Sequence, residues 1–358
     1  MKAALDRFLS ELEQLEKYIQ YIDSVGSIIR YTPVEADSVA INDRLNATKA
    51  ILGDLPLRKV FEYNSIVVSM YGFFEKFIET VLVGYLDQLC GFVPNFSNLP
   101  SPVKENHSIL SAQLIQNLKV PKYENENISL IATKLHNCLV NDKSELNTIA
   151  FTDHTSNFRI SSITEFFSRI GIKSIGSKIK LNENFHAFLN ERLGSDLNIH
   201  ITEEKIIFNL LSDLAQRRND ISHGTGLENT ILNNSIFPEY IEFLRQFSNA
   251  LFEILRDATL EYECGRDFAA SSYVAIFDHN ILCLEVKDIN ISVGDRIIVR
   301  SGSASNYIFF ERIIEEIQIN NVSHANIAIQ GESTRVGFKL NGRVKKNQSF
   351  YLKRTGDL

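Results

Sequence analysis

The spacing of hydrophobic residues divides the chain into a long helical part and a shorter part with strand character. Up to about Phe268, apolar residues recur at three- and four-residue steps, the repeat of an amphipathic helix. From Tyr273 onward, short β-branched runs alternate with polar positions and are separated by turn residues. The pattern predicts an α+β multidomain protein: an all-α helical bundle over residues 1–268, followed by a small antiparallel β-barrel over residues 269–358.

The helical part is built around one unusually apolar segment. Leu57–Cys90 is apolar on nearly every side, which is typical of the central helix of a bundle. Charged residues, among them Glu75, interrupt it, so it is not expected to span a membrane. The proline-containing stretch Gly91–Asn106 is expected to be a loop. Other helices are predicted at Leu5–Ile29, Ile109–Leu118, Ile128–Val140, Ile163–Ile170, Glu183–Leu193, Thr202–Ser222 with Thr202 as its N-cap, and Pro238–Glu261.

The second part predicts six or seven short strands. Turn signals such as Gly294-Asp295 and Asn341-Gly342 lie between them. The strands are expected at Val274–Phe277, Ile281–Val286, Arg296–Val299, Ile313–Ile319, Ala325–Ile329, Val336–Leu340 and Ser349–Leu352.

Composition limits the class of protein to which the chain can belong. With 44% hydrophobic and 23% charged residues, the 358-residue chain has the make-up of an ordinary globular protein. Its four cysteines show no C-x-x-C spacing, which argues against a disulfide framework or a zinc site and favours the cytoplasm. The N-terminus lacks the apolar core of a signal peptide, and no membrane partner is expected.

The net charge of −7 offers no overall basic field for nucleic acid, but the barrel carries a basic stripe. Between Arg335 and Arg354 there are seven basic residues and no acidic one. The candidate RNA-binding residues in this stripe are Arg343, Lys345, Lys346, Lys353 and Arg354. The alternative is a solvated barrel face.

The chemistry of the chain is concentrated at the end of one predicted helix, in the stretch Arg217 to Gly224. The apolar stripe of this helix, continued at the helical period, passes through Arg218, so this arginine is expected to face a partner, an acid or a cleft. Arg217 is expected to face solvent. A permanent cation next to an imidazole that titrates near neutrality suits an RNA phosphodiester without a metal or other cofactor.

Within this stretch, Arg218 and His223 are five residues apart, or about 140° around a helix. A two-fold axis would overcome this separation by placing the arginines and histidines of two chains in one cleft. There Arg218 would bind the phosphate, Asn219 would orient the histidine, and His223 would act as general base or acid. The alternative is a helix C-cap in which His223 bonds the last carbonyls. Asp153-His154 lies in a polar loop without metal-like spacing, so no metal is expected.

Arg218-Asn219-x-x-x-His223, followed by glycine, resembles the R-x4-6-H motif of the HEPN superfamily (higher eukaryotes and prokaryotes nucleotide-binding). The earlier helix, with Tyr71-x-x-Phe74-Glu75, is similar to the aromatic-and-acid helix of such proteins. The resemblance implies a dimeric, metal-independent endoribonuclease of toxin, abortive-infection or anti-phage type, with an antitoxin or defence-system partner. Arg218, Asn219 and His223 become candidate catalytic residues and Glu75 a candidate helper, unless Glu75 only pairs with a buried arginine.

The sequence departs from the family pattern at one position and carries one further likeness in its second part. Thr225 stands where some family toxins carry a modified tyrosine, so control by nucleotidylation there is in doubt. The segment from Val293-Gly294-Asp295 to Leu352 resembles the second, β-barrel domain of translational GTPases, which implies tRNA or other translation-related RNA as partner, or a docking role. No phosphate-binding P-loop occurs, so GTPase activity is not implied. The competing interpretation is a catalytically silent HEPN-like module for dimerisation or nucleic-acid binding.

Overall fold

The computed structural model describes residues 1–31, 39–53, 58–194, 198–199, 201–224, 233–303 and 306–353. Within them, eleven α-helices precede a β-barrel, which confirms the predicted α+β class. The chain forms two compact units. The first comprises Met1–Leu86, Pro100–Val140 and Glu145–Phe252, and the second comprises Asp87–Leu99, Asn141–Ser144 and Glu253–Leu358.

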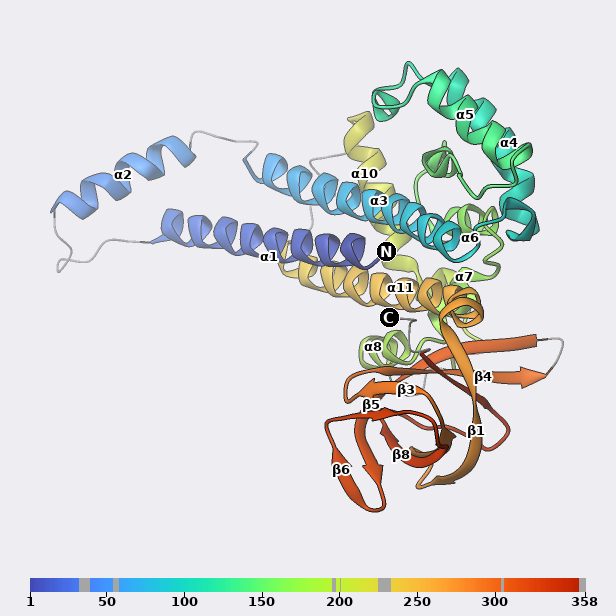
Figure 1. The fold of residues 1–358 in the computed structure, drawn as a ribbon. Coiled ribbons are helices and arrows are strands. Elements are labelled where there is room, and N and C mark those ends of the chain that lie inside the picture. The colour runs from blue at the N-terminus through green and yellow to red at the C-terminus, as the bar shows by residue number, and fades with distance from the viewer. Residues whose placement is uncertain are drawn as a thin grey trace. The chain divides into compact units, whose positions relative to one another are not determined.

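The first unit is organised by three long helices that run alongside one another: α1 (Lys2–Arg30), α3 (Arg58–Phe92) and the first half of α11 (Phe237–Asp267) (Figure 1). The ring of Phe8 in α1 stacks on Phe77 of α3 with centroids 4.8 Å apart. Phe74 of α3 meets Phe247 of α11 edge-on at 5.6 Å. The apolar Leu57–Cys90 segment is therefore central, as predicted, because both neighbours bury their apolar stripes against it.

Shorter helices surround these three. Their bounds are α2 Val39–Gly53, α4 Ser101–Gln116, α5 Ile128–Leu139, α6 Ile160–Ser168, α7 Ile175–Lys180, α8 Glu183–Leu193, α9 Glu204–Ile207 and α10 Asn209–His223. Two of them, α2 and α7, were not predicted from the sequence.

Two predictions about these helices are wrong. Gly91–Asn106 is not all loop, because α4 begins at Ser101 and accommodates Pro102 in its first turn, where a proline costs no hydrogen bond. The helix expected from Thr202 to Ser222 is broken at Phe208, between α9 and α10. The ring of Phe208 is fully buried and stacks near Phe185, so packing overrides the regular helical repeat there. Thr202 is not the N-cap; Glu203 is.

The strands form a closed antiparallel barrel of six strands in the order β4-β9-β1-β2-β8-β5, with β5 returning to β4. The short β6 pairs with β5, and β3 pairs with β7. Strand bounds are β1 Phe268–Phe277, β2 Ile281–Val286, β3 Ile289–Ser292, β4 Arg296–Ser303, β5 Asn306–Ile319, β6 Val322–His324, β7 Asn326–Ile329, β8 Thr334–Leu340 and β9 Ser349–Lys353. All seven predicted strands are present, and β3 and β6 were missed.

The second unit also includes the last part of α11, from Glu253 onward. The carboxylate of Glu263 is almost fully buried and is held by Arg256, 2.7 Å away, and by Arg296 of β4. Leu260 of the helix shares a small core with Ile298 of the barrel. The helix therefore ends as a packed part of the barrel unit rather than as a free linker.

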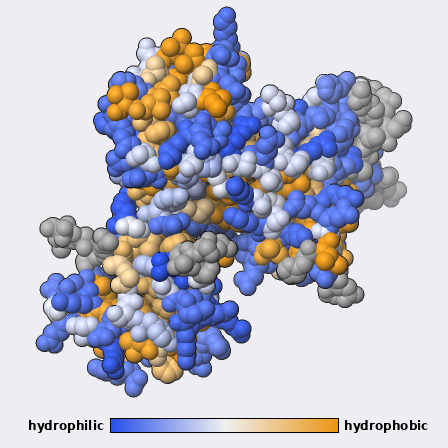
Figure 2. Space-filling model, turned by 90° about the vertical axis from the view of Figure 1, so that its right-hand side faces the viewer, coloured by the Kyte–Doolittle hydropathy of each residue, from blue (hydrophilic) through white to orange (hydrophobic). Residues whose placement is uncertain are grey.

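Large apolar side chains gather on the outer surface of the first unit over α4 and α5. Ile109 is 60% exposed, Ile128 59%, Leu139 57% and Val140 67%. The upper part of Figure 2 shows the corresponding orange patch. An exposed apolar patch of this kind is typical of proteins that bind other macromolecules.

Candidate functional site

Arg218 lies half-buried on α10, as the position of its helical stripe predicts. Its guanidinium carbon sits 5.5 Å from the centre of the Tyr71 ring, within the range of a cation–π contact. One Nη atom donates to Oδ1 of Asn157 at 3.5 Å. No carboxylate in the described part of the chain forms an ion pair with Arg218, so its charge remains available to a ligand.

Asn219 follows Arg218 and faces the same region. The side-chain amide of Asn157 donates to Oδ1 of Asn219 and, at 3.4 Å, to the carbonyl of Ala215. Asn157 thus links the two polar residues of α10 to the segment that leads into α6.

Arg218 and Asn219 line a polar pocket of about 490 Å³ together with residues of the segment before and at the start of α6. The described lining residues are Thr155, Ser156, Asn157, Arg159, Ser161, Ser162, Arg218 and Asn219. Two of the eight side chains are cationic and none is acidic or large and apolar. This composition fits an anionic, hydrogen-bonding ligand.

His223 is the last residue of α10 and is exposed. Gly224 follows in the left-handed conformation, φ +66°, and its N–H bonds the carbonyls of Asp220 and Ile221. The helix end is therefore closed by the glycine, and the predicted alternative in which the His223 ring bonds the last carbonyls is wrong for the described residues. His223 is not among the described residues that line the pocket.

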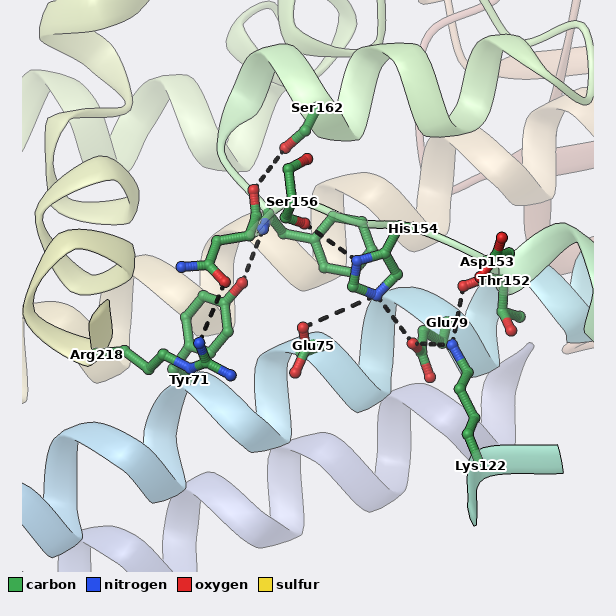
Figure 3. Close-up of polar contacts among 12 residues, drawn as sticks. Tyr71, Glu75, Glu79, Lys122, Thr152, Asp153, His154, Ser156, Ser162 and Arg218 are labelled. Carbon is green, nitrogen blue, oxygen red and sulfur yellow. Dashed lines mark hydrogen bonds and ion pairs between the residues drawn. The ribbon is translucent and has the colours of Figure 1, made fainter. Parts of the chain in front are cut away.

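A second polar cluster lies along α3 beside this pocket (Figure 3). His154 stands between two acids, with Nε2 3.0 Å from Oε1 of Glu79 and 3.8 Å from Oε1 of Glu75. Its Nδ1 lies 3.1 Å from the carbonyl of Ser156. Each ring nitrogen thus faces an oxygen that can accept a hydrogen bond. The alternative that Glu75 pairs only with a buried arginine is wrong, because His154 is the partner that the fold brings to it.

The carboxylate of Glu79 joins this cluster to another loop. Lys122 donates to it at 2.6 Å and also to the carbonyl of Thr152 at 2.9 Å. Burial acts to raise the pKa of Glu79, but the hydrogen bonds from His154 and Lys122 outweigh it and leave the pKa below its usual value. Glu79 is therefore a charged anchor for the loop that carries His154 and Asn157.

Tyr71 connects the two clusters, because its ring lies under Arg218 and its hydroxyl reaches the loop. The hydroxyl oxygen accepts the backbone N–H of Phe158 at 2.7 Å. Burial, reinforced by the charge of Glu75, raises the pKa of Tyr71 well above its ordinary value, so the phenol stays neutral. Tyr71, Glu75 and Glu79 are four residues apart and share one face of α3.

The comparison with known protein families agrees with this helical architecture. The family model of RiboL-PSP-HEPN matches residues 37–257, more than half of the chain. The chain belongs to the RiboL-PSP-HEPN family. HEPN domains are nucleic-acid-related modules, often ribonucleases and often dimeric. No curated protein matches the chain significantly.

The HEPN match includes every residue of the two clusters but assigns none of them a role. No three or more His, Cys, Asp or Glu side chains within the described ranges are arranged to hold a metal ion. Among the helices that the structure describes, none has the length and apolarity needed to cross a membrane.

Arg217, the neighbour of Arg218, corrects another expectation. It does not face solvent: its side chain is 20% exposed, and Nε lies 2.6 Å from Oδ2 of Asp213. Nη1 donates to the hydroxyl of Tyr63 at 2.8 Å, and the hydroxyl of Tyr240 bonds the same Asp213. Side chains from α3 and α11 converge on Arg217, and the local helical stripe gives no sign of them.

The basic residues proposed for the barrel are placed on its outer surface. Arg343, Lys345, Lys346 and Lys353 are exposed, whereas Arg354 lies outside the described residues, as does Thr225.

His154, Asn157 and Arg159 are the site residues that sequence reasoning missed. The available signal was the polar run from Asp153 to Arg159 between two apolar stretches. Only Asp153-His154 was considered, as metal ligands, whereas the fold brings the whole run against α3 and α10.

Proposed function

We propose that this HEPN protein is a metal-independent endoribonuclease of the toxin or anti-phage defence type. The observation that carries the proposal is the half-buried Arg218, which no described carboxylate neutralises, beside Asn219 in a polar pocket. A cation held in this way costs desolvation free energy, which a bound phosphate would offset.

The chemistry follows from the residue types. The imidazole of His223 removes the proton of the ribose 2′-hydroxyl, and the 2′-oxygen attacks the adjacent phosphorus. The bond from phosphorus to the 5′-oxygen breaks, a second imidazole protonates that oxygen, and a 2′,3′-cyclic phosphate remains. Arg218 stabilises the charge that develops on the phosphoryl oxygens, Asn219 orients the groups at the helix end, and Glu75 acts indirectly, through His154.

A homodimer supplies the second imidazole in this proposal. His223 is exposed and does not line the pocket of its own chain, while Arg218 and Asn219 do. Two copies related by a two-fold axis would place the His223 of each near the pocket of the other and double the positive charge.

In this proposal residues 1–268 form the nuclease domain and residues 269–358 hold the RNA. The exposed Lys345 and Lys346, with Arg343 and Lys353, would contact phosphates of tRNA or another translation-related RNA. The likeness to the second domain of translational GTPases supports the same partner. A cytoplasmic location and an antitoxin or defence-system partner complete the proposal.

One observation favours a second function, a catalytically silent HEPN module for dimerisation or nucleic-acid binding. The Oδ1 atom of Asn219 is already engaged by Asn157, and His223 contributes nothing to the pocket of its own chain. A binding module would need the positive pocket but not the histidine.

Purified wild type, His223→Ala and, as a matched control, His136→Ala would be incubated with total RNA and tRNA in EDTA. We expect wild type and the control to leave 2′,3′-cyclic phosphate ends and His223→Ala to cut at most about a thousandth as fast, with unchanged fold and oligomeric state. Equal cutting by His223→Ala would remove this residue from the mechanism. Absence of cutting by all three, with RNA still bound, would favour the silent module.

A further inference from the structure

A second arginine lines the pocket of Arg218. Arg159 precedes α6 and is half-buried, and its Nη2 donates to Oε1 of Gln216 at 2.9 Å. The amide of Gln216 in turn donates to Oδ1 of Asp220, also at 2.9 Å. Within the described residues, no carboxylate forms an ion pair with Arg159. The guanidinium is thus held in place by a neutral amide and keeps its full charge.

Arg159 and Arg218 occupy different points of the pocket. Gln216, which holds Arg159, is exposed on α10, whereas Arg218 is half-buried on the same helix and held through Tyr71 and Asn157. Residues two apart on a helix do not face the same way. Because different partners hold the two guanidinium groups, the pocket offers two cationic positions.

Hydroxyl groups line the same pocket as Arg159. Thr155, Ser156 and Ser161 line the pocket and are exposed. Ser162 is engaged internally, because its hydroxyl donates to the carbonyl of Asn157 at 2.9 Å and accepts the N–H of Arg159 at 2.8 Å. An arginine surrounded by several hydroxyl groups presents the donors that phosphate oxygens prefer.

We infer that Arg159, with the hydroxyl groups of Thr155, Ser156 and Ser161, binds the RNA phosphate next to the one that is cut. The ligand class is a single-stranded nucleic-acid backbone, because two separate cations in one pocket match successive phosphates of a strand. Arg159 is a binding residue here, since Arg218 and His223 perform the chemistry. The inference rests on the proposed ribonuclease function for the identity of the neighbouring phosphate.

The test compares wild type, Arg159→Ala and Arg159→Lys, with Arg44→Ala as a control that removes an exposed arginine of α2. Binding is measured by fluorescence anisotropy with a fully 2′-O-methylated RNA, which cannot be cut, from 50 to 200 mM salt. Cleavage of unmodified RNA gives KM and kcat. Thermal unfolding verifies that each variant is folded.

We expect Arg159→Ala to raise Kd and KM about tenfold, to leave kcat within about twofold, and to make the slope of log K against log salt shallower by about 0.7. Arg159→Lys should recover much of the binding, because it restores the charge without the planar fork. Arg44→Ala should match wild type.

Three outcomes separate the inference from the proposed function. If wild type cuts RNA and Arg159→Ala matches it in Kd, KM and salt slope, the phosphate subsite is wrong and the nuclease stands. If wild type cuts nothing but Arg159→Ala still weakens binding, the nuclease fails and the subsite stands. If inorganic phosphate binds wild type as tightly as the oligonucleotide does, the pocket is a site for a free anion, and the RNA-strand inference is overturned.

Discussion

Two consecutive arginines of α10 sit in opposite electrostatic surroundings. Arg217 is bound by Asp213 and Tyr63, and Tyr240 completes the same network. Arg218 has an aromatic ring, an amide and a pocket, but no described carboxylate. Both side chains are partly buried, so both lose hydration on folding.

The difference separates the structural from the functional use of a buried cation. A neutralised arginine ties helices together, and its desolvation is offset within the fold. An arginine without a counter-ion carries a desolvation free energy that the fold does not offset and that a bound ligand can offset. This arrangement is typical of binding and catalytic sites. Of the two neighbours, only Arg218 is placed to do so.

The largest effect that would test this contrast is the loss of catalysis in Arg218→Ala. We expect RNA cleavage to fall by about a thousandfold, because the charge that stabilises the transition state is removed. The free energy of unfolding should change by at most about 1 kcal/mol, since only one cation–π contact and one long hydrogen bond are lost. Single-turnover cleavage and urea unfolding measure the two quantities. A large loss of stability with cleavage retained would mean that Arg218 is a structural residue rather than a catalytic one.

Arg217→Ala should show the opposite behaviour. We expect a loss of about 2 kcal/mol of stability, because Asp213 and Tyr63 lose a shared partner in a partly buried setting. Cleavage per folded molecule should remain within about twofold. Urea unfolding combined with active-site titration measures both, and Asp213→Asn, which weakens the same network, is the matched variant. A collapse of kcat in folded Arg217→Ala would contradict the structural assignment.

The fall in the free energy of unfolding at acid pH should depend on Glu79, which anchors the His154 loop. Because its pKa is lower in the folded protein, ionised Glu79 stabilises the fold above its ordinary pKa of about 4.5, and this contribution is lost as pH falls through the folded pKa. Glu79→Gln should cost about 1–2 kcal/mol at pH 7, and the deficit should shrink below about pH 4. Urea unfolding at several pH values measures it. A deficit that is independent of pH would mean that lost packing, rather than lost charge, is responsible.

The smallest expected effect lies on the barrel, at basic residues that are exposed to solvent. Replacing Lys345 and Lys346 with Glu should weaken RNA binding about three- to tenfold and reduce its salt dependence, while kcat stays unchanged. Filter binding from 50 to 200 mM salt measures it, with the double variant Lys173→Glu/Lys178→Glu, at exposed lysines of the helical unit, as the charge-matched control. Unchanged binding would leave the whole RNA site to the pocket of α10.

Local patterns predicted much of the fold because apolar periodicity reflects burial directly. The bounds of α8 and of β2 were predicted to the residue, and Arg218 was correctly placed on the inner stripe of its helix. The break at Phe208 and the burial of Arg217 were not predicted, because their causes lie in side chains distant in sequence. A helical repeat says which way a residue points, not what meets it there.

The same limit explains the site. Glu75 was singled out, but its partner His154 follows it only after the rest of α3 and all of α4 and α5, and the fold of the loop onto α3 brings the two together. Asn157 and Arg159 belong to a run of polar residues with no motif of their own. Their roles come from the helices that they touch.

The four-residue spacing of Tyr71, Glu75 and Glu79 along α3 has a genetic consequence. Inserting one residue after Tyr71 would rotate everything downstream by about 100°, turning both acids away from His154 while Tyr71 stays beneath Arg218. The same rotation would also move Phe74 and Phe77 out of their contacts with Phe247 and Phe8. The core and the polar cluster therefore depend on one helical register, and a small in-frame insertion here is expected to lose both stable expression and the link between the loop and the pocket.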